Sequence, residues 1–135
     1  MKLITRDTDY AVRAVCLIAQ QKGRIVTAKK LEPALHLPGP FLRKILQILN
    51  KEGILKSFKG QGGGFLLAKK PKEIFLTDLM RIFQGKPSLN ECFLKKIICP
   101  HTRSCPLRKK IVKIEDYVLR ELGTVTIASL LKREI

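Results

Sequence analysis

The segment PFLRKILQILNKEGILKSFKGQGGGFLLA (residues 40–68) joins a helical pattern to a β-hairpin pattern. Apolar residues recur at helical spacing over residues 40–51, and basic and polar residues occupy the opposite face. After Gly53, the segments 54–59 and 65–68 have the composition of strands, and GQGGG at 60–64 supplies a flexible turn between them. A helix followed at once by such a hairpin predicts the recognition helix and wing of a winged helix.

Two segments ahead of residue 40 complete a helix-turn-helix. Residues 27–35 (TAKKLEPAL) predict a short helix with Thr27 as its N-cap, and a Leu-Pro-Gly-Pro turn follows. Residues 5–21 predict the first helix, with Thr8 as its N-cap and Asp9 in its positive first turn. The order helix, short helix, tight turn, helix with a basic outer face is that of a helix-turn-helix protein.

Three helices are predicted after the wing, at residues 77–84 with Thr77 as N-cap, 107–122 and 126–131. The longest, 107–122, carries an apolar stripe that repeats every three or four residues: Leu107, Ile111, Ile114, Val118 and Leu122. A narrow stripe is typical of a helix that pairs with a copy of itself, although packing against its own domain would give the same periodicity. We expect dimerisation, because a protein that binds a two-fold symmetric DNA site needs such an element.

The chain is strongly basic, with 27 Lys and Arg against 11 Asp and Glu and a net charge of +16 over 135 residues. This excess indicates a polyanion binder, with nucleic acid as the first candidate and a merely solvated basic surface as the alternative. The N-terminus lacks the pattern of a signal peptide, and no apolar run reaches the roughly 18 residues that span a bilayer. We therefore expect a cytoplasmic protein without a membrane partner.

Three cysteines are concentrated in one segment, C-FLKKII-C-P-HTRS-C-P, at Cys92, Cys99 and Cys105. In a cytoplasmic protein this density favours a metal or cluster site over disulfides. Thiolates suit iron–sulfur clusters, zinc and copper(I) alike, but gaps of six and five residues are wider than the usual zinc knuckle and favour a larger cluster. The fourth cysteine, Cys16, lies in the apolar run of the first helix and is expected to be a packing residue.

The order of these motifs resembles the winged-helix regulators that include the iron–sulfur sensor IscR and the nitric-oxide sensor NsrR. The resemblance covers nearly the whole chain and rests on Thr8-Asp9-Tyr10-Ala11, on Pro40-Phe41-Leu42-Arg43-Lys44-Ile45-Leu46, on Gly53-Ile54-Leu55-Lys56-Ser57 and on Gly60-Gln61-Gly62-Gly63-Gly64-Phe65-x-Leu67. The cysteines then precede a long helix, as in the cluster-binding members.

The resemblance implies a homodimer that places two recognition helices in successive major grooves of a palindromic double-stranded DNA operator. It assigns the major-groove face to Gly39, Pro40, Arg43, Lys44 and Gln47, with Arg43 as the best candidate for reading a guanine. It places Lys56, Lys59 and Gln61 of the wing against phosphates or the minor groove. Generic phosphate contact is the alternative role for each lysine.

The resemblance also implies a 4Fe–4S or 2Fe–2S cluster on Cys92, Cys99 and Cys105, with a fourth ligand to be found. IscR-like members place a histidine three residues after the third cysteine, where this chain has Arg108, a poor ligand. NsrR-like members take an aspartate of the partner's first helix, and Asp9 occupies that position. His101 is the local alternative, and solvent or a small thiol is the third.

The sequence thus predicts a mostly α fold with a small β-wing (α+β): a winged helix-turn-helix plus a long dimerisation helix. The expected parts are a DNA-binding domain at 1–85, a cluster-binding linker at 86–106, and a dimerisation helix with a C-terminal cap at 107–135. We expect a transcriptional regulator, a repressor, whose cluster senses iron or cluster supply, nitric oxide or redox state. The alternatives are the same regulator with zinc, a thiol/disulfide switch or no metal, and a basic RNA-associated protein.

An enzyme is not expected. Cys99 and His101 could form a nucleophile and base, but no orienting group or oxyanion element accompanies them. No small-molecule substrate is expected either.

Overall fold

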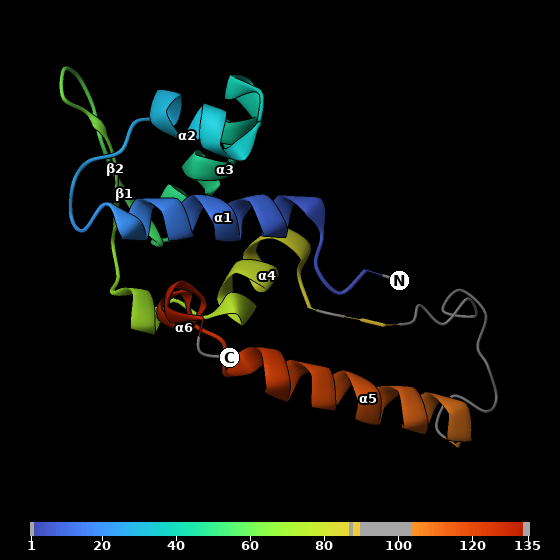
Figure 1. Cartoon of the computed structure of the whole chain (residues 1–135). Helices are drawn as coiled ribbons and strands as arrows, with labels where there is room; N and C mark the ends of the chain where they lie inside the picture. The colour runs from blue at the N-terminus through green and yellow to red at the C-terminus, as the bar shows by residue number, and fades with distance from the viewer. Residues whose placement is uncertain (1, 87, 90–103, 134–135) are drawn as a thin grey trace.

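The structure is a computed structural model that describes residues 2–86, 88–89 and 104–133. Its elements, shown in Figure 1, are α1 (Arg6–Gln20), α2 (Ala28–Leu35), α3 (Gly39–Lys51), β1 (Leu55–Phe58), β2 (Gly64–Leu67), η1 (Pro71–Glu73), α4 (Leu76–Gln84), α5 (Pro106–Gly123) and α6 (Ile127–Lys132). The helices α2 and α3 lie on one side of α1, and α4, α5 and α6 lie on the other. The predicted α+β winged-helix fold is confirmed.

Helix α1 is the centre of the core. Its Ala11, Ala14, Val15 and Ile18 are buried at the spacing that the sequence predicted. They pack in one cluster with the apolar faces of the neighbouring elements: Leu31, Leu35, Leu42, Ile45, Leu46, Leu49, Ile54, Leu55, Ile74, Leu79 and Ile127. Burial of each large aliphatic side chain stabilises the fold by roughly 1.5–3 kcal/mol, so this cluster holds α3 and the wing on α1.

The predicted N-cap of α1 was wrong. Thr5, in an extended conformation, caps the helix, and its hydroxyl accepts a hydrogen bond from the backbone N–H of Thr8. Thr8 itself lies inside the first turn with 0% of its surface exposed. Both threonines are good caps in sequence, and tertiary contacts of the Thr8 hydroxyl decide between them.

The wing is an antiparallel hairpin in which Leu55 pairs with Leu67 and Phe58 pairs with Gly64. A bridge between Val26 and Phe65, with backbone hydrogen bonds of 3.0 and 2.8 Å, attaches β2 to the segment before α2. Gly64 makes this approach possible: its φ is +152°, and a Cβ there would lie 2.6 Å from the Val26 carbonyl oxygen. The wing is thus anchored to the helix-turn-helix on the side away from β1.

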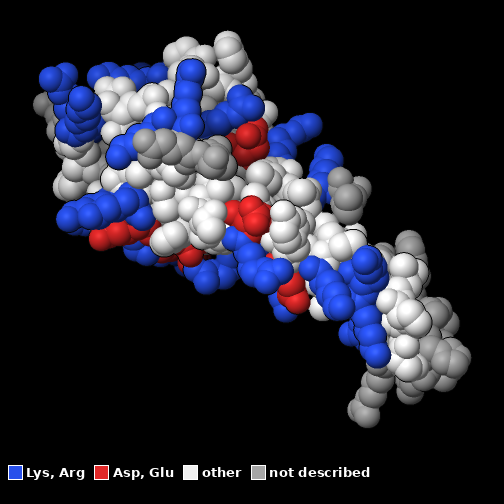
Figure 2. Space-filling model, turned by 60° about the horizontal axis from the view of Figure 1, so that its bottom comes forward, with Lys and Arg blue, Asp and Glu red and all other residues white. Residues whose placement is uncertain are grey.

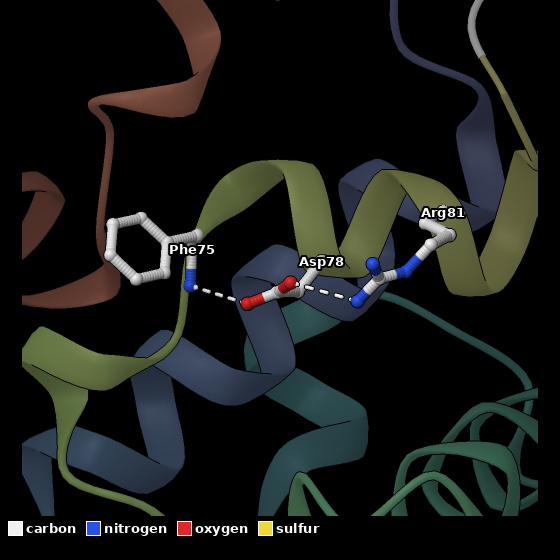
Figure 3. A network of polar contacts seen from close by, with 3 residues as sticks. All are labelled: Phe75, Asp78 and Arg81. Atoms are coloured by element: carbon white, nitrogen blue, oxygen red, sulfur yellow. Dashed lines mark hydrogen bonds and ion pairs between the residues drawn. The ribbon is translucent and has the colours of Figure 1, made fainter.

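Helix α4 begins at Leu76, one residue before the predicted N-cap Thr77, so that prediction was wrong. Phe75 occupies the cap position, and the Asp78 side chain reaches back to its backbone N–H (Figure 3). One Asp78 carboxylate oxygen accepts from the Phe75 N–H at 3.2 Å, and the other pairs with Arg81 at 3.0 Å. Asp78 therefore makes the N3 half of a capping box, in which the third helical residue binds the N–H of the cap residue, and no side chain at the N-cap position accepts from the helix.

The long helix α5 extends from the body of the molecule (Figure 1). It contains no buried residue, whereas Val125 and Ile127 just after it are buried. Thr126 caps α6 by accepting from the Ser129 N–H at 3.0 Å, and a bridge to Phe75 ties this turn to α4. None of the helices in the described residues is both long and apolar enough to cross a bilayer.

Candidate nucleic-acid interface and candidate cluster site

The outer face of α3 carries the residues predicted to face DNA. Pro40, Arg43, Lys44 and Gln47 are all exposed, at spacings of three and four. On the opposite face Leu42, Ile45, Leu46 and Leu49 are buried against α1 and the wing. The helix therefore presents its basic and amide side chains as one continuous row, available to a groove.

Gly39 differs from the other residues predicted to face the major groove. It is half-buried at the start of α3, and a Cβ there would lie 2.5 Å from a carboxylate oxygen of Glu32 in α2. A side chain at this position would have to displace the end of the flexible Glu32 side chain, whereas the backbone of α2 would not have to move.

Two aromatic rings fix the start of α3 on α1. The rings of Tyr10 and Phe41 meet edge to face, with centroids 6.0 Å apart and planes at 83°. Such a pair contributes about 0.5–1.5 kcal/mol beyond its buried area. Tyr10 directly follows Asp9, so the first turn of α1 is in contact with the start of α3.

The wing exposes Lys56, Lys59 and Gln61, as the sequence predicted for side chains that meet DNA. It also exposes Phe58, with 44% of its surface accessible, because its cross-strand partner Gly64 has no side chain to cover it. The sequence interpretation did not single out Phe58. An aromatic residue between two lysines, opposite a glycine in the hairpin register, was the available signal.

In the part of the chain that the structure describes, no basic side chain of α3 or the wing has an ion-pair partner. Among the described residues the ion pairs are Arg13 with Asp9 and Arg81 with Asp78, and neither involves α3 or the wing. Figure 2 shows a different face, on the side of the molecule turned away from α3, where Lys and Arg also cover more of the surface than Asp and Glu. The net charge of +16 attracts a polyanion over long range.

The candidate cluster site lies largely outside the described residues. Of its predicted ligands, Cys92, Cys99 and His101 fall in the segment 90–103, and Cys105 and Asp9 are described. Within the described ranges, no three His, Cys, Asp or Glu side chains converge as a metal site would require. Cys105 is half-buried at the N-cap of α5, followed by Pro106 in the first turn.

Asp9 lies in the first turn of α1 and is available at the surface. Its side chain is 46% exposed, and its carboxylate pairs with the Arg13 guanidinium at 3.0 Å. A partly solvated pair one helical turn apart is worth little, about 0.3–0.5 kcal/mol. Asp9 can therefore exchange this partner for another at small cost.

The predicted dimerisation stripe is partly accessible in the isolated chain, and Leu122 at its end packs against the cluster of Leu76, Met80 and Val125. Leu107 and Ile114 are 66% and 45% exposed, and the other three members of the stripe are half-buried. Val112 and Tyr117, outside the stripe, are also exposed, at 42% and 57%.

A hydrogen-bond network that the sequence interpretation missed joins α4 to α1. Gln84, the last residue of α4, accepts from the Thr5 N–H at 3.0 Å and from the Thr8 hydroxyl at 2.8 Å. Its amide nitrogen donates to the Leu3 carbonyl at 2.9 Å. No local pattern signals this contact, because its partners are about eighty positions apart in the chain. It fixes the residue from which the chain leaves toward the cysteines.

Comparison with known proteins agrees with this architecture. A family model described as "Rrf2: Iron-dependent Transcriptional regulator" matches residues 4–133. The transcriptional regulator NsrR of Geobacillus kaustophilus (strain HTA426) is 31% identical over 131 residues, which cover 96% of this chain and 89% of the relative.

Solved structures of low sequence identity share the fold. CymR, described as the global cysteine regulator of B. subtilis, aligns with a TM-score of 0.83 at 22% identity and covers 98% of both chains. T. potens IscR aligns with a TM-score of 0.76 at 23% identity, over 100% of this chain and 89% of that one.

Proposed function

Because this chain belongs to the Rrf2 family of helix-turn-helix transcriptional regulators, we propose that it acts as a homodimer on a palindromic operator in double-stranded DNA. It is a DNA-binding regulator and not an enzyme. The proposal includes repression as the outcome of binding and the cytoplasm as the location. The observation that carries it is the unpaired row of basic and amide side chains on α3 beside the exposed wing.

In this proposal α3 lies in the major groove. Arg43 reads a base, since a guanidinium can donate two parallel hydrogen bonds to guanine. Lys44 and Gln47 extend the contact along the groove, with Pro40 and Gly39 at the entry of the helix. Lys56, Lys59 and Gln61 of the wing contact phosphates or the minor groove, and they position the protein more than they specify sequence.

The homodimer is proposed to form through α5. Its stripe of Leu107, Ile111, Ile114, Val118 and Leu122 has no buried member in the single chain. A second copy of the same helix would cover this stripe in an isologous contact. Pairing along α5 would set the distance between the two copies of α3, and hence the spacing of half-sites.

An iron–sulfur cluster, 4Fe–4S or 2Fe–2S, is proposed on Cys92, Cys99 and Cys105, with Asp9 of the partner subunit as fourth ligand and His101 as the alternative. The donor set fits such a group: thiolates suit iron–sulfur clusters, and the half-buried Cys105 stands at a helix N-terminus, which favours negative charge. When bound, the cluster supplies a centre that responds to iron or cluster supply, nitric oxide or redox state.

The residues of the chain offer a route from this site to DNA. Asp9 exchanges its weak pair with Arg13 for a new partner, and Tyr10 beside it packs on Phe41 at the start of α3. Gln84 holds the same turn of α1 to the end of α4. A shift of the first turn of α1 is therefore transmitted to the recognition helix.

A thiol/disulfide switch, zinc or no metal in the linker is the second candidate. We keep this candidate beside the cluster because thiolates suit zinc as well as iron–sulfur clusters. Purification without oxygen separates these candidates. A brown protein with iron, sulfide and visible absorbance supports the cluster, and a colourless protein with one equivalent of zinc excludes it.

Two variants sharpen this test. Cys105→Ser is expected to lose the visible absorbance and bound iron, while Cys16→Ser, which changes the thiol in α1, keeps both. Retention of iron in the Cys105 variant would remove Cys105 from the ligand set. Loss of iron in both variants would indicate a general effect on folding.

Binding to DNA is tested by selection from a random duplex library. The expected product is a palindrome with one fixed half-site spacing, bound by a dimer and protected at both half-sites. Preference for single-stranded or structured RNA over every selected duplex would favour the RNA-associated alternative and overturn the operator proposal.

A further inference from the structure

A hollow at the base of the wing is left without a role by the function proposed above. It has a volume of about 410 Å³ and is formed where the end of α1 meets the end of β2. Its floor includes Ile18, Ala19 and Leu67, and its rim carries Lys22, Lys69 and Lys70. We refer to these three lysines as the wing-base lysines.

The wing-base lysines are brought together from two distant parts of the chain. Lys22 follows α1 in a left-handed conformation, with φ of 50°, and Lys69 and Lys70 follow β2. All three are exposed, and so are Arg24 and Lys72 on either side. No carboxylate lines the hollow.

The charge of this cluster is not neutralised within the described part of the chain, where neither ion pair includes a wing-base lysine. The nearest carboxylate in sequence, Glu73, accepts instead from the backbone N–H of Lys70 at 3.1 Å. Stabilisation of the C-terminal end of α1, whose last turn has no basic residue, would account for Lys22 but not for the two lysines after β2.

We propose that the wing-base lysines bind the phosphate backbone of the same DNA whose groove the wing enters, on the flank of the operator. Strand β2 leads from the tip of the wing to Lys69, and its four residues span roughly 13 Å at about 3.3 Å each. Duplex DNA carries one charge per about 1.7 Å of axis, and the proposal requires the duplex to pass within a lysine side chain's length of the base of the wing. An open rim of lysines suits such a polyanion.

The test replaces the three wing-base lysines together, as Lys22→Gln, Lys69→Gln and Lys70→Gln. The matched control removes the same charge from α5, with Lys109→Gln, Lys110→Gln and Lys113→Gln, all exposed on a helix that extends away from the wing (Figure 1). Affinity for a selected operator duplex and for a scrambled duplex of equal length is measured against salt concentration. Urea unfolding checks that both triple variants fold.

The wing-base variant is expected to lower the slope of log affinity against log salt by about 2–3, at about 0.9 per lost phosphate contact. Affinity near 0.1 M salt then falls by about 100- to 1,000-fold on both duplexes, taking the two proteins as equal at about 1 M salt, and hydroxyl-radical protection is lost only on the flank. The α5 control keeps the slope and the footprint of the unaltered protein.

Three results would overturn the inference. An unchanged slope would show that the wing-base lysines do not meet DNA, and an equal change in the α5 control would show a general charge effect. Inorganic phosphate binding that disappears in the wing-base variant while the DNA slope stays would assign the hollow to a small anion. The inference rests on DNA binding by the wing, so failure of the unaltered protein to bind any duplex would remove both proposals.

Discussion

The hydroxyl of Thr8 donates a hydrogen bond of 2.8 Å to Oε1 of Gln84, 76 residues away. The orientation of the amide is fixed by its other partners, because the Thr5 N–H can only donate and the Leu3 carbonyl can only accept. Since the Thr8 hydroxyl donates to Gln84, the contact of 3.0 Å between the two threonine hydroxyls has Thr5 as its donor. The N-cap of α1 and the end of α4 thus form one ordered network.

Two single substitutions in this network are expected to destabilise the fold by different amounts. Thr8→Val keeps the buried shape and removes two hydrogen bonds, the one donated to Gln84 and the one accepted from the Thr5 hydroxyl, which should lower the free energy of unfolding by about 1–2 kcal/mol. Gln84→Ala removes the acceptor and the donor together and should cost about 2 kcal/mol. Urea unfolding measures both, with Gln20→Ala at an exposed site of α1 as the control.

The double variant decides whether the two residues act together. Its loss should be smaller than the sum of the single losses, because the shared bond can be removed only once. Strict additivity would show that Thr8 and Gln84 stabilise the protein independently.

The same network shows which features of the fold could be predicted from the sequence and which could not. The apolar face of α3 and the glycine turn of the wing were predicted correctly, since period 3.6 and a run of glycines are local signals. The caps at Thr8 and Thr77 were predicted wrongly, because Gln84 and Asp78 determine these helix starts through side-chain contacts.

The candidate site also has features that the sequence predicts and features that it does not. Exposure of Arg43 and Lys44 follows from the amphipathic pattern of α3, whereas the contact of Tyr10 with Phe41 depends on how two helices pack. The assignment of Cys92, Cys99 and His101 stays a prediction from sequence, as these residues lie outside the described ranges.

Arg43→Ala is expected to weaken binding to a selected operator by about 1–3 kcal/mol and to relax preference at one base position per half-site. The reason is the loss of a bidentate contact to a base edge. Competition assays with single-base operator variants measure the effect. Lys44→Ala is the neighbouring control and should weaken all duplexes alike. If Arg43→Ala weakened binding to operator and scrambled DNA equally, Arg43 would contact phosphate and would not read a base.

Substitutions at two glycines of the wing distinguish the cost of backbone strain from the cost of a steric clash. Gly62 and Gly64 both have positive φ, at 73° and 152°, but only Gly64 faces a neighbour, the Val26 carbonyl oxygen. Gly62→Ala should cost about 1–2 kcal/mol from strain alone. Gly64→Ala should cost about 3 kcal/mol or more, because it also breaks the bridge to Val26. Urea unfolding compares them, and equal losses would show that the bridge contributes little.

The thiol of Cys16 links stability to pH. Burial raises the pKa of this thiol, so the unfolded chain ionises first as pH rises. The contribution of this thiol to the free energy of unfolding should be constant below the ordinary thiol pKa of about 8.5. It should fall as pH rises above that value. Cys16→Ala should lack that part of the decline. Alkylation by iodoacetamide should also be slower at Cys16 in the folded protein than in urea, as read by mass spectrometry; equal rates would contradict the burial argument.

Ile114→Glu tests the proposed dimer through a single exposed position. Ile114 belongs to the apolar stripe of α5, so a charge there would be buried without a partner in a helix pair, and the dimer should dissociate to monomers. Val112 offers a matched control: it has 42% exposure against 45% for Ile114, and about 100° of rotation per residue places it well away from the stripe. Val112→Glu should therefore leave the dimer intact.

Sedimentation velocity gives the oligomeric state of both variants, and circular dichroism shows whether their helices are kept. A folded monomer for Ile114→Glu beside a dimer for Val112→Glu would place the interface on the stripe. Dimers for both would exclude the stripe, and monomers for both would move the interface to a wider surface of α5. Because each half-site of a palindrome then binds alone, the monomeric variant should also lose the preference for one half-site spacing while Arg43 still reads its base.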